Sequence, residues 1–401
     1  MTKFEKWYFD TIEFILEEGD VRPDRTGTGT MGVFTVDYTH NLIKDGFPIL
    51  SSRKFNYRNP IIEMIGFMRG ITNSNWFNAQ GCPFWNGFGL PGNEYMRKRK
   101  EDFVLADEYC SEKGKWKGND PEYIERYRKL NSLPVEEGLK LITDHGISLY
   151  EDIQIGEVGD LGPIYGAMWR NWPGKNGFVF DQLKYAFEEL RARPHNRRIV
   201  INGWNPSFMP DPSLKPHENV PNGNMSLTPC HVLHEYHTAP IPVNKRIGMI
   251  NDYCHVRQMV DWEAYSNKNR SDEEIHDKLD EYGIPRYYLD LCWYQRSWDF
   301  ILGAPANIAG YSAMLMMMAK LQGMIPRFVS VKAVHVHIYN NHLDGVKEML
   351  RRRDDGEIPE CKPELIVNQP KDVKFIDQFE VEDFELVGYE HLSHIKFPIA
   401  I

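Results

Sequence analysis

The sequence predicts a mixed α/β fold, and three stretches carry that prediction. Phe4 to Leu16 has apolar residues at the 3.6-residue period of a helix. Gly32 to Tyr38 alternates between apolar and polar residues as a half-buried strand does. Ile308 to Gln322 is apolar along most of its length, which is typical of a long buried helix. The chain therefore combines helices with strands.

The remaining elements follow in chain order. Gly27 and Gly29, in the motif DRTGTGT, mark a tight turn before the first strand. We also expect a helix over 61–70 and strands over 199–204, 289–294 and 333–338. The stretches at about 91–157 and 239–286 are rich in charged residues and are expected to be surface insertions with some helix. No linker separates domains, so residues 1–401 are expected to form a single domain with two insertions.

Composition limits the classes of partner. The net charge of −10 argues against broad binding to nucleic acid, which requires a basic face. The most apolar stretch, 309–321, is interrupted by Lys320 and is too short to span a membrane. Six cysteines are scattered without a CxxC pair, and no secretory signal is visible. We therefore expect a cytoplasmic protein that binds neither nucleic acid nor a membrane.

Cys230, in SLTPCHVLHEY, is a candidate nucleophile, but its local sequence is also explained by simple packing. A cysteine between a proline and a histidine is most often a small buried apolar residue. A Cys–His protease pair is disfavoured, because such partners meet in space and are not sequence neighbours. Asn307 opens the long apolar helix, where an asparagine is usually an N-cap.

Three further groups of polar residues have equally simple explanations. Arg296, Ser297 and Asp299 come at the end of a predicted strand, and an arginine there is usually a surface or ion-pair residue.

Arg197 and Arg198 begin another strand and would point to opposite faces, so one pocket would not easily use both. Such a pair is most often a solvated charge cluster. His335, His337 and Tyr339 share one face of a strand. A metal site there lacks supporting carboxylate or cysteine spacing, so hydrogen bonding is the favoured role and no metal is expected.

The order of the motifs is more informative than any one of them. DRTGTGT, a helix bearing Glu63, DLGPIYGAMWR, RR, PCH, QRSxD, PxNIAxY and HxHxYNNH follow one another, and FELVGYEHLSHIKFPIAI ends the chain. This order resembles the thymidylate synthase family over most of the chain outside the two insertions. The resemblance implies an α/β (α+β) catalytic domain with a large twisted mixed sheet and a long central buried helix. It also implies a homodimer, assembled through the sheet, with shared active sites.

The resemblance implies one-carbon transfer to dUMP. A thiolate at Cys230 would add to C6 of the pyrimidine, so that C5 can attack the methylene of the co-substrate 5,10-methylenetetrahydrofolate. Arg296 would lie near both the thiol and the phosphate, and Glu63 would organise water and proton transfer at O4. The catalytic residues implied are Cys230, Glu63, Tyr165, His231, Arg296 and Asn307.

The resemblance also assigns residues to each part of the ligands. The phosphate would be bound by Arg25, Arg296 and Ser297 of one subunit and by Arg197 and Arg198 of its partner. His337 and Tyr339 would hold the sugar 3′-hydroxyl, and Asn307 would read the base. In the related deoxycytidylate hydroxymethylases the position of Asn307 is occupied by Asp, so the Asn here favours dUMP as the substrate. The folate would contact Trp85, Asp299, Gly303 and C-terminal residues including Ile401, with Arg53 at its tail.

Departures from the family pattern cluster on the folate side. Ala306 replaces a Phe, Phe88 replaces a Trp, Asn86 and Gly87 replace an acidic pair, and Gly310 replaces a Ser. A looser folate stack would admit water to the C5 methylene. The sequence therefore favours a deoxyuridylate hydroxymethylase of phage type, located in the host cytoplasm and producing 5-hydroxymethyl-dUMP. The alternatives are a thymidylate synthase that produces dTMP and dihydrofolate, and a catalytically silent nucleotide-binding homologue.

Overall fold

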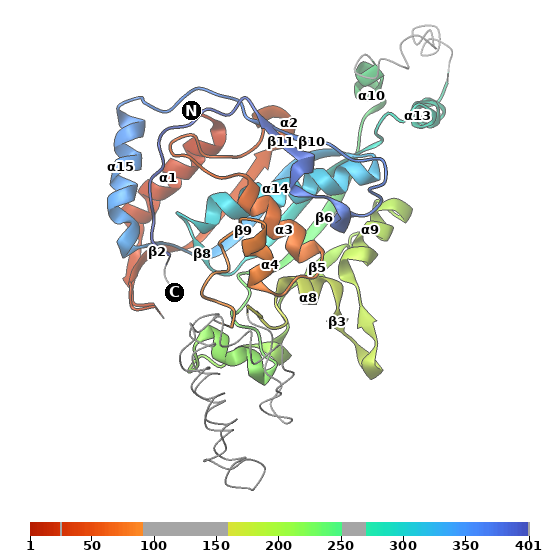
Figure 1. Cartoon of the computed structure of the whole chain (residues 1–401). Coiled ribbons are helices and arrows are strands. Elements are labelled where there is room, and N and C mark those ends of the chain that lie inside the picture. The colour runs from red at the N-terminus through yellow and green to blue at the C-terminus, as the bar shows by residue number, and fades with distance from the viewer. Residues whose placement is uncertain (25, 91–158, 251–269, 400–401) are drawn as a thin grey trace, which may run out of the picture. The chain divides into compact units, whose positions relative to one another are not determined.

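The computed structural model describes residues 1–24, 26–90, 159–250 and 270–399 (Figure 1). Two compact units are distinguished. The first comprises Met1–Ile71, Tyr165–Trp204 and Pro229–Ile401, and the second comprises Thr72–Ile164 and Asn205–Thr228. Arg25, Ile401, the first predicted insertion and positions 251–269 of the second lie outside the described residues.

The described part of the first unit is built on a seven-stranded mixed sheet with the order β1-β2-β9-β7-β6-β5, and β8 pairs with β9. Its strands are β1 (Asp20–Arg22), β2 (Thr30–Asn41), β5 (Val200–Asn202), β6 (His231–Pro240), β7 (Tyr287–Gln295), β8 (Trp298–Asp299) and β9 (Ile325–Tyr339). β9 is antiparallel to β2 and parallel to β7, and β6 is antiparallel to both of its neighbours. The predicted strands and the mixed sheet are confirmed, although β9 begins well before the predicted start at 333.

Helix α14 (Gly303–Gln322) is the long buried helix that the sequence predicts. It lies between the sheet and α3 (Arg58–Met68), as Figure 1 shows. It ends at Gly323, whose φ of +64° suits a helix C-cap. Its first turn lies earlier than predicted, so the expectation that Asn307 caps the helix is wrong, and Asn307 is inside α14.

Helix α1 (Lys3–Glu18) confirms the first predicted element. The Thr2 side chain accepts a hydrogen bond from the Glu5 backbone N–H and caps the helix. The apolar face that packs toward β2 includes the fully buried Tyr8 and Ile12. Further helices of the unit are α2 (Leu42–Asp45), α8 (Tyr165–Arg170), α9 (Gln182–Ala192) and α15 (Leu343–Asp354). Two small sheets pair β3 (Trp172–Pro173) with β4 (Val179–Phe180), and β10 (Glu364–Val367) with β11 (Phe384–Val387).

The pairing of β2 with β9 is interrupted at one position without a change of register. Val33 pairs with Val336 and Thr35 with Val334, so one residue of each strand is left out of the register. The residue omitted from β9 is His335, whose φ is +49°. Buried positions of β9 change from odd to even numbers across His335. His335, His337 and Tyr339 of the predicted row all lie at positions that alternate with the buried Val336 and Ile338, and His335 differs from the other two in its positive φ.

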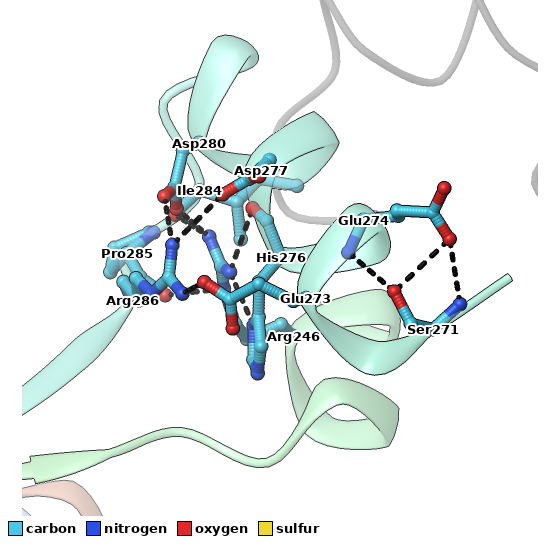
Figure 2. Close-up of polar contacts among 10 residues, drawn as sticks. All are labelled: Arg246, Ser271, Glu273, Glu274, His276, Asp277, Asp280, Ile284, Pro285 and Arg286. Atoms are coloured by element: carbon cyan, nitrogen blue, oxygen red, sulfur yellow. Dashed lines mark hydrogen bonds and ion pairs between the residues drawn. The ribbon is translucent and has the colours of Figure 1, made fainter.

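The described part of the second insertion is helical, as predicted. α10 (Val243–Met249) and α13 (Asp272–Glu281) pack around a small core of Ile250, Ile275, Leu279 and Ile284. Arg246 is fully buried there, and its guanidinium donates to the Asp280 carboxylate and to the backbone carbonyls of His276, Ile284 and Pro285 (Figure 2). These hydrogen bonds offset the cost of burying the Arg246 charge, because several of its N–H groups have an acceptor.

The second unit contains the short helix α4 (Ser74–Ala79) and several 3₁₀ turns in its described part. The Trp85 ring packs against Phe77 and against the edge of Phe88, each at 6.3 Å between centroids. Across all described residues, every helix is too short or too polar to traverse a bilayer.

Candidate active site

Cys230 and Arg296 are brought together by two neighbouring antiparallel strands. Cys230 directly precedes β6, Arg296 directly follows β7, and His231 pairs with Gln295 at that end of the sheet. An Arg296 Nη atom lies 3.8 Å from the Cys230 Sγ atom. Arg296 also donates its backbone N–H to the Cys230 carbonyl at 2.9 Å and its Nε–H to the Pro229 carbonyl at 2.7 Å. The arginine therefore fixes the cysteine backbone as well as facing its sulfur.

Two opposing effects act on the Cys230 thiol. Burial raises its pKa, because the thiolate loses hydration, whereas the nearby Arg296 guanidinium lowers it. Asp299 adds a smaller effect that raises the pKa. The net direction of the pKa shift is upward, so the Arg296 cation does not fully compensate for burial.

Tyr165 supports the same segment from α8. Its hydroxyl oxygen accepts the backbone N–H of Cys230 at 2.8 Å and is 3.4 Å from that of His231. Its ring stacks on Phe67 at 4.7 Å. Burial raises the pKa of this phenol, so it remains protonated at neutral pH and keeps its O–H proton to donate.

His231 is a neutral link between two polar groups. Its Nδ1 atom is 3.3 Å from the Tyr311 hydroxyl, and its imidazole is hydrogen-bonded with the Asn307 side chain. Burial lowers its pKa to about 4. Because a neutral imidazole both donates and accepts, His231 can relay a proton without carrying charge at neutral pH.

Glu63 belongs to the same neighbourhood. It lies on α3 and is 7 % exposed. Burial raises the pKa of the Tyr311 phenol, and the charges of Tyr165, Tyr236 and Glu63 contribute in the same direction. The carboxylate is thus an electrostatic neighbour of the Tyr311 hydroxyl that contacts His231.

Asn307 presents its carboxamide from the second turn of α14. Its side-chain oxygen accepts a hydrogen bond from the indole Nε1–H of Trp298 at 3.0 Å. Trp298 is 1 % exposed and lies on β8. Sequence reasoning missed Trp298, although its place between two predicted ligands, Ser297 and Asp299, was an available signal.

The predicted sugar ligands lie beside this cluster on β9. His337 pairs with Asp299 of β8, and its Nδ1 atom is 2.8 Å from the His335 carbonyl oxygen. The His337 and Tyr339 rings are in edge contact at 5.0 Å. Arg197 and Arg198 are both exposed in the segment before β5, so the structure does not bury them in a pocket of their own chain.

The predicted folate residues of the first unit meet where α14 begins. Arg53 is buried and donates to the Ile301 carbonyl at 2.8 Å, and its guanidinium lies over the Phe397 ring at 5.0 Å. The Asp299 carboxylate accepts the backbone N–H groups of Ile301 and Leu302. Gly303 is the first residue of α14. Trp85 belongs to the second unit and packs within it.

Comparison with known proteins identifies the family. The sequence profile described as thymidylate synthase matches residues 6–401. The chain belongs to the thymidylate synthase family. A protein named thymidylate synthase from Pseudomonas fluorescens (strain SBW25) is 28% identical over 396 residues, which cover 99% of this chain and 100% of that protein. Another of that name, from Aster yellows witches'-broom phytoplasma (strain AYWB), is 29% identical over 394 residues, which cover 98% of this chain and 99% of that protein.

As a member of the thymidylate synthase family, the chain is a one-carbon transferase, and membership supports dUMP as the acceptor and methylenetetrahydrofolate as the co-substrate. The described residues hold no group of three or more His, Cys, Asp or Glu side chains arranged to bind a metal ion.

The structure explains one of the departures from the thymidylate synthase pattern. A Cβ atom at Gly310 would come within 3.1 Å of the Met64 side chain and within 3.2 Å of the Pro60 carbonyl. Close packing of α14 against α3 therefore favours glycine at this position. Ala306 has 4% exposure and carries a small side chain one residue before Asn307.

Proposed function

We propose that the chain transfers the methylene carbon of 5,10-methylenetetrahydrofolate to C5 of dUMP through a covalent adduct at Cys230. The observation that best supports this proposal is the Cys230–Arg296 pair, with 3.8 Å between sulfur and guanidinium nitrogen. A structural cysteine does not need a facing cation, whereas a nucleophilic thiolate does. The catalytically silent homologue is disfavoured, because binding a nucleotide requires no nucleophile.

The neighbouring residues suit the steps that follow. Addition of the Cys230 thiolate to C6 places negative charge on O4 and C5 of the pyrimidine. Tyr165, whose hydroxyl accepts the Cys230 backbone N–H, and the neutral His231 next in sequence supply hydroxyl and imidazole groups near this residue. Asn307 would pair with N3–H and O4, and buried Glu63 would manage the proton at O4. C5 then attacks the one-carbon unit, and loss of the C5 proton and of tetrahydrofolate leaves an exocyclic methylene.

For the last step we propose that water adds to the exocyclic methylene and that the Cys230 thiolate is then eliminated from C6, which releases 5-hydroxymethyl-dUMP and the free enzyme. Support comes from Ala306 and Phe88, which are smaller than the aromatic residues that the family usually has there. Less ring surface against the folate would allow water to reach the methylene. Gly310 no longer supports this choice, because close packing of two helices accounts for it.

A thymidylate synthase is the second candidate, and one observation favours it. The relatives named thymidylate synthase align with this chain over nearly their whole lengths. In that reaction the folate supplies hydride to the methylene and is oxidised to dihydrofolate.

The products distinguish the two candidates. The purified chain is incubated with dUMP and methylenetetrahydrofolate, the nucleotide is analysed by mass spectrometry, and dihydrofolate is followed by absorbance. We expect 5-hydroxymethyl-dUMP and tetrahydrofolate. Formation of dTMP with stoichiometric dihydrofolate would contradict the proposed last step while retaining the Cys230 adduct. Absence of any turnover or adduct would contradict the whole proposal.

We also propose a cytoplasmic homodimer in which the whole chain acts as one catalytic domain. Support for the dimer comes from the sheet face opposite α14, where Thr35 of β2, Tyr294 of β7 and Val200 of β5 are exposed. Arg197 and Arg198 are likewise exposed and available to a partner subunit.

Subunit complementation tests the shared sites. Cys230→Ala and Arg198→Gln chains are each purified, then mixed and allowed to exchange subunits. If the arginine serves the partner, a mixed dimer contains one intact site, and about a quarter of the wild-type activity should return. If each arginine serves its own chain, mixing restores no activity. Sedimentation of Tyr294→Asp, which places a charge on the exposed face, tests the interface separately and should show a monomer.

A further inference from the structure

The Asn307 carboxamide has two polar neighbours, and they constrain it differently. One is the indole N–H of Trp298, 3.0 Å from the Asn307 side-chain oxygen. The other is the imidazole of His231. Trp298 is held rigidly, because it is 1 % exposed and makes edge contacts with Trp293 at 6.3 Å and with Phe300 at 5.8 Å.

Trp298 can impose a direction on the amide and His231 cannot. An indole nitrogen only donates, so the atom of Asn307 that faces it must be the carbonyl oxygen. The neutral imidazole of His231 can donate or accept according to its tautomer. The Tyr311 hydroxyl beyond it can also do either. The His231 side of the network therefore adapts to both orientations of the amide.

We propose that Trp298 is a specificity-determining positioning residue that makes Asn307 read uracil and reject cytosine. This inference rests on the proposed function, in which Asn307 pairs with the base. Uracil offers an N3–H donor and an O4 acceptor, which match a carboxamide whose oxygen stays on the Trp298 side and whose NH₂ group points to O4. The second lone pair of that oxygen remains available for N3–H.

Cytosine requires the opposite arrangement. It offers an N3 acceptor and an N4 amino donor, so the carboxamide must rotate by half a turn to pair with it. Rotation brings the Asn307 NH₂ group against the Trp298 N–H, and two donors then face each other in a buried site. The indole loses its acceptor as well, and a buried unpaired donor is costly. The discrimination therefore comes from a residue that does not touch the base.

The test measures nucleotide binding, which needs no turnover. Dissociation constants for dUMP and dCMP are obtained by calorimetry for the wild-type chain and for Trp298→Phe, which keeps a ring and removes the donor. The ratio of the dCMP constant to the dUMP constant should fall about tenfold, or about 1.4 kcal/mol, mainly through tighter binding of dCMP. Trp298→Met, which fills irregular space without a donor, carries the same prediction if the Phe variant folds poorly.

Trp293→Phe is the matched control. Trp293 is equally buried, but its indole N–H donates to the Gln295 side chain at 3.1 Å. Removing that donor should leave the dCMP/dUMP ratio unchanged.

An unchanged dCMP/dUMP ratio in both donor-free Trp298 variants would overturn the inference, as would an equal fall of the ratio in Trp293→Phe. In either case a wild-type preference for dUMP would still uphold the proposed function. A wild-type chain that binds neither nucleotide would overturn the proposed function, and the inference with it.

Discussion

Arg296→Gln should slow alkylation of Cys230 and move its pH dependence to higher pH. The guanidinium nitrogen is 3.8 Å from the sulfur. Unit charges at that distance attract by about 4 kcal/mol at an effective dielectric constant of about 20, and by about 1 kcal/mol in bulk water. Loss of the cation should therefore reduce the thiolate population at neutral pH by between about fivefold and about a thousandfold.

The change in rate should be smaller than the change in thiolate population. A thiolate becomes more nucleophilic as its pKa rises, with a Brønsted coefficient of about 0.4–0.5, which offsets nearly half of the effect on a logarithmic scale. We expect alkylation to slow by about 2-fold to about 50-fold. Burial already raises the pKa of Cys230, so the wild-type rate should itself increase with pH above neutrality.

The assay is reaction with iodoacetamide across a pH series, with the modified peptides quantified by mass spectrometry. Cys361, whose sulfur contacts the Ser51 hydroxyl and the Glu390 carbonyl, serves as an internal reference. Arg296→Lys retains a cation and should fall between the wild type and Arg296→Gln. Superimposable pH profiles for the wild type and Arg296→Gln would refute the assignment of Arg296 as the group that activates the thiol.

Three other substitutions test separate parts of the account. Asn307→Asp should shift the preference toward dCMP by about tenfold or more, because a well-formed pair to a base edge discriminates by about 1–3 kcal/mol; unchanged relative dissociation constants would mean that other groups read the base. Gly310→Ala should lower the free energy of unfolding in urea by about 1–3 kcal/mol, because the added methyl meets Met64 at 3.1 Å; an unchanged midpoint would show that the helices can separate freely. Burial raises the pKa of Glu5, so its contribution to stability is present below its unfolded pKa of about 4.3 and is lost as pH rises through the native pKa. The wild type should therefore lose stability relative to Glu5→Gln as pH increases through that window, and parallel stability curves would contradict this.

Periodicity located the main elements but not their ends. The helix at 4–16 and the strand at 32–38 were found because alternate or helical spacing of apolar residues reflects one buried face. The start of α14 at Gly303 was missed, because Gly303 and Pro305 carry little helical signal of their own. The change of buried face at His335 was also missed, since it depends on the positive φ of that residue and on the pairing of β9 with β2, which lies about 300 residues away in sequence.

The candidate site was predicted through the order of its motifs rather than from any residue alone. Local sequence favoured packing for Cys230, and only the antiparallel pairing of β6 with β7 shows why Arg296 faces it. The direction of the thiol's pKa shift depends on how burial and the Arg296 charge balance in the folded chain, which the sequence does not report. The role inferred for Trp298 depends on one hydrogen bond across the site, which no spacing rule reports.

Trapping with 5-fluoro-dUMP tests most directly whether Cys230 forms the carbon–sulfur bond. Fluorine cannot leave C5 as a proton does, so the adduct should persist once the one-carbon unit has been joined. After incubation with methylenetetrahydrofolate and proteolysis, the Cys230 peptide should carry the mass of both the nucleotide and the folate, and Cys230→Ala should carry neither. An enzyme that converts dUMP while its Cys230 peptide remains unmodified would contradict the mechanism.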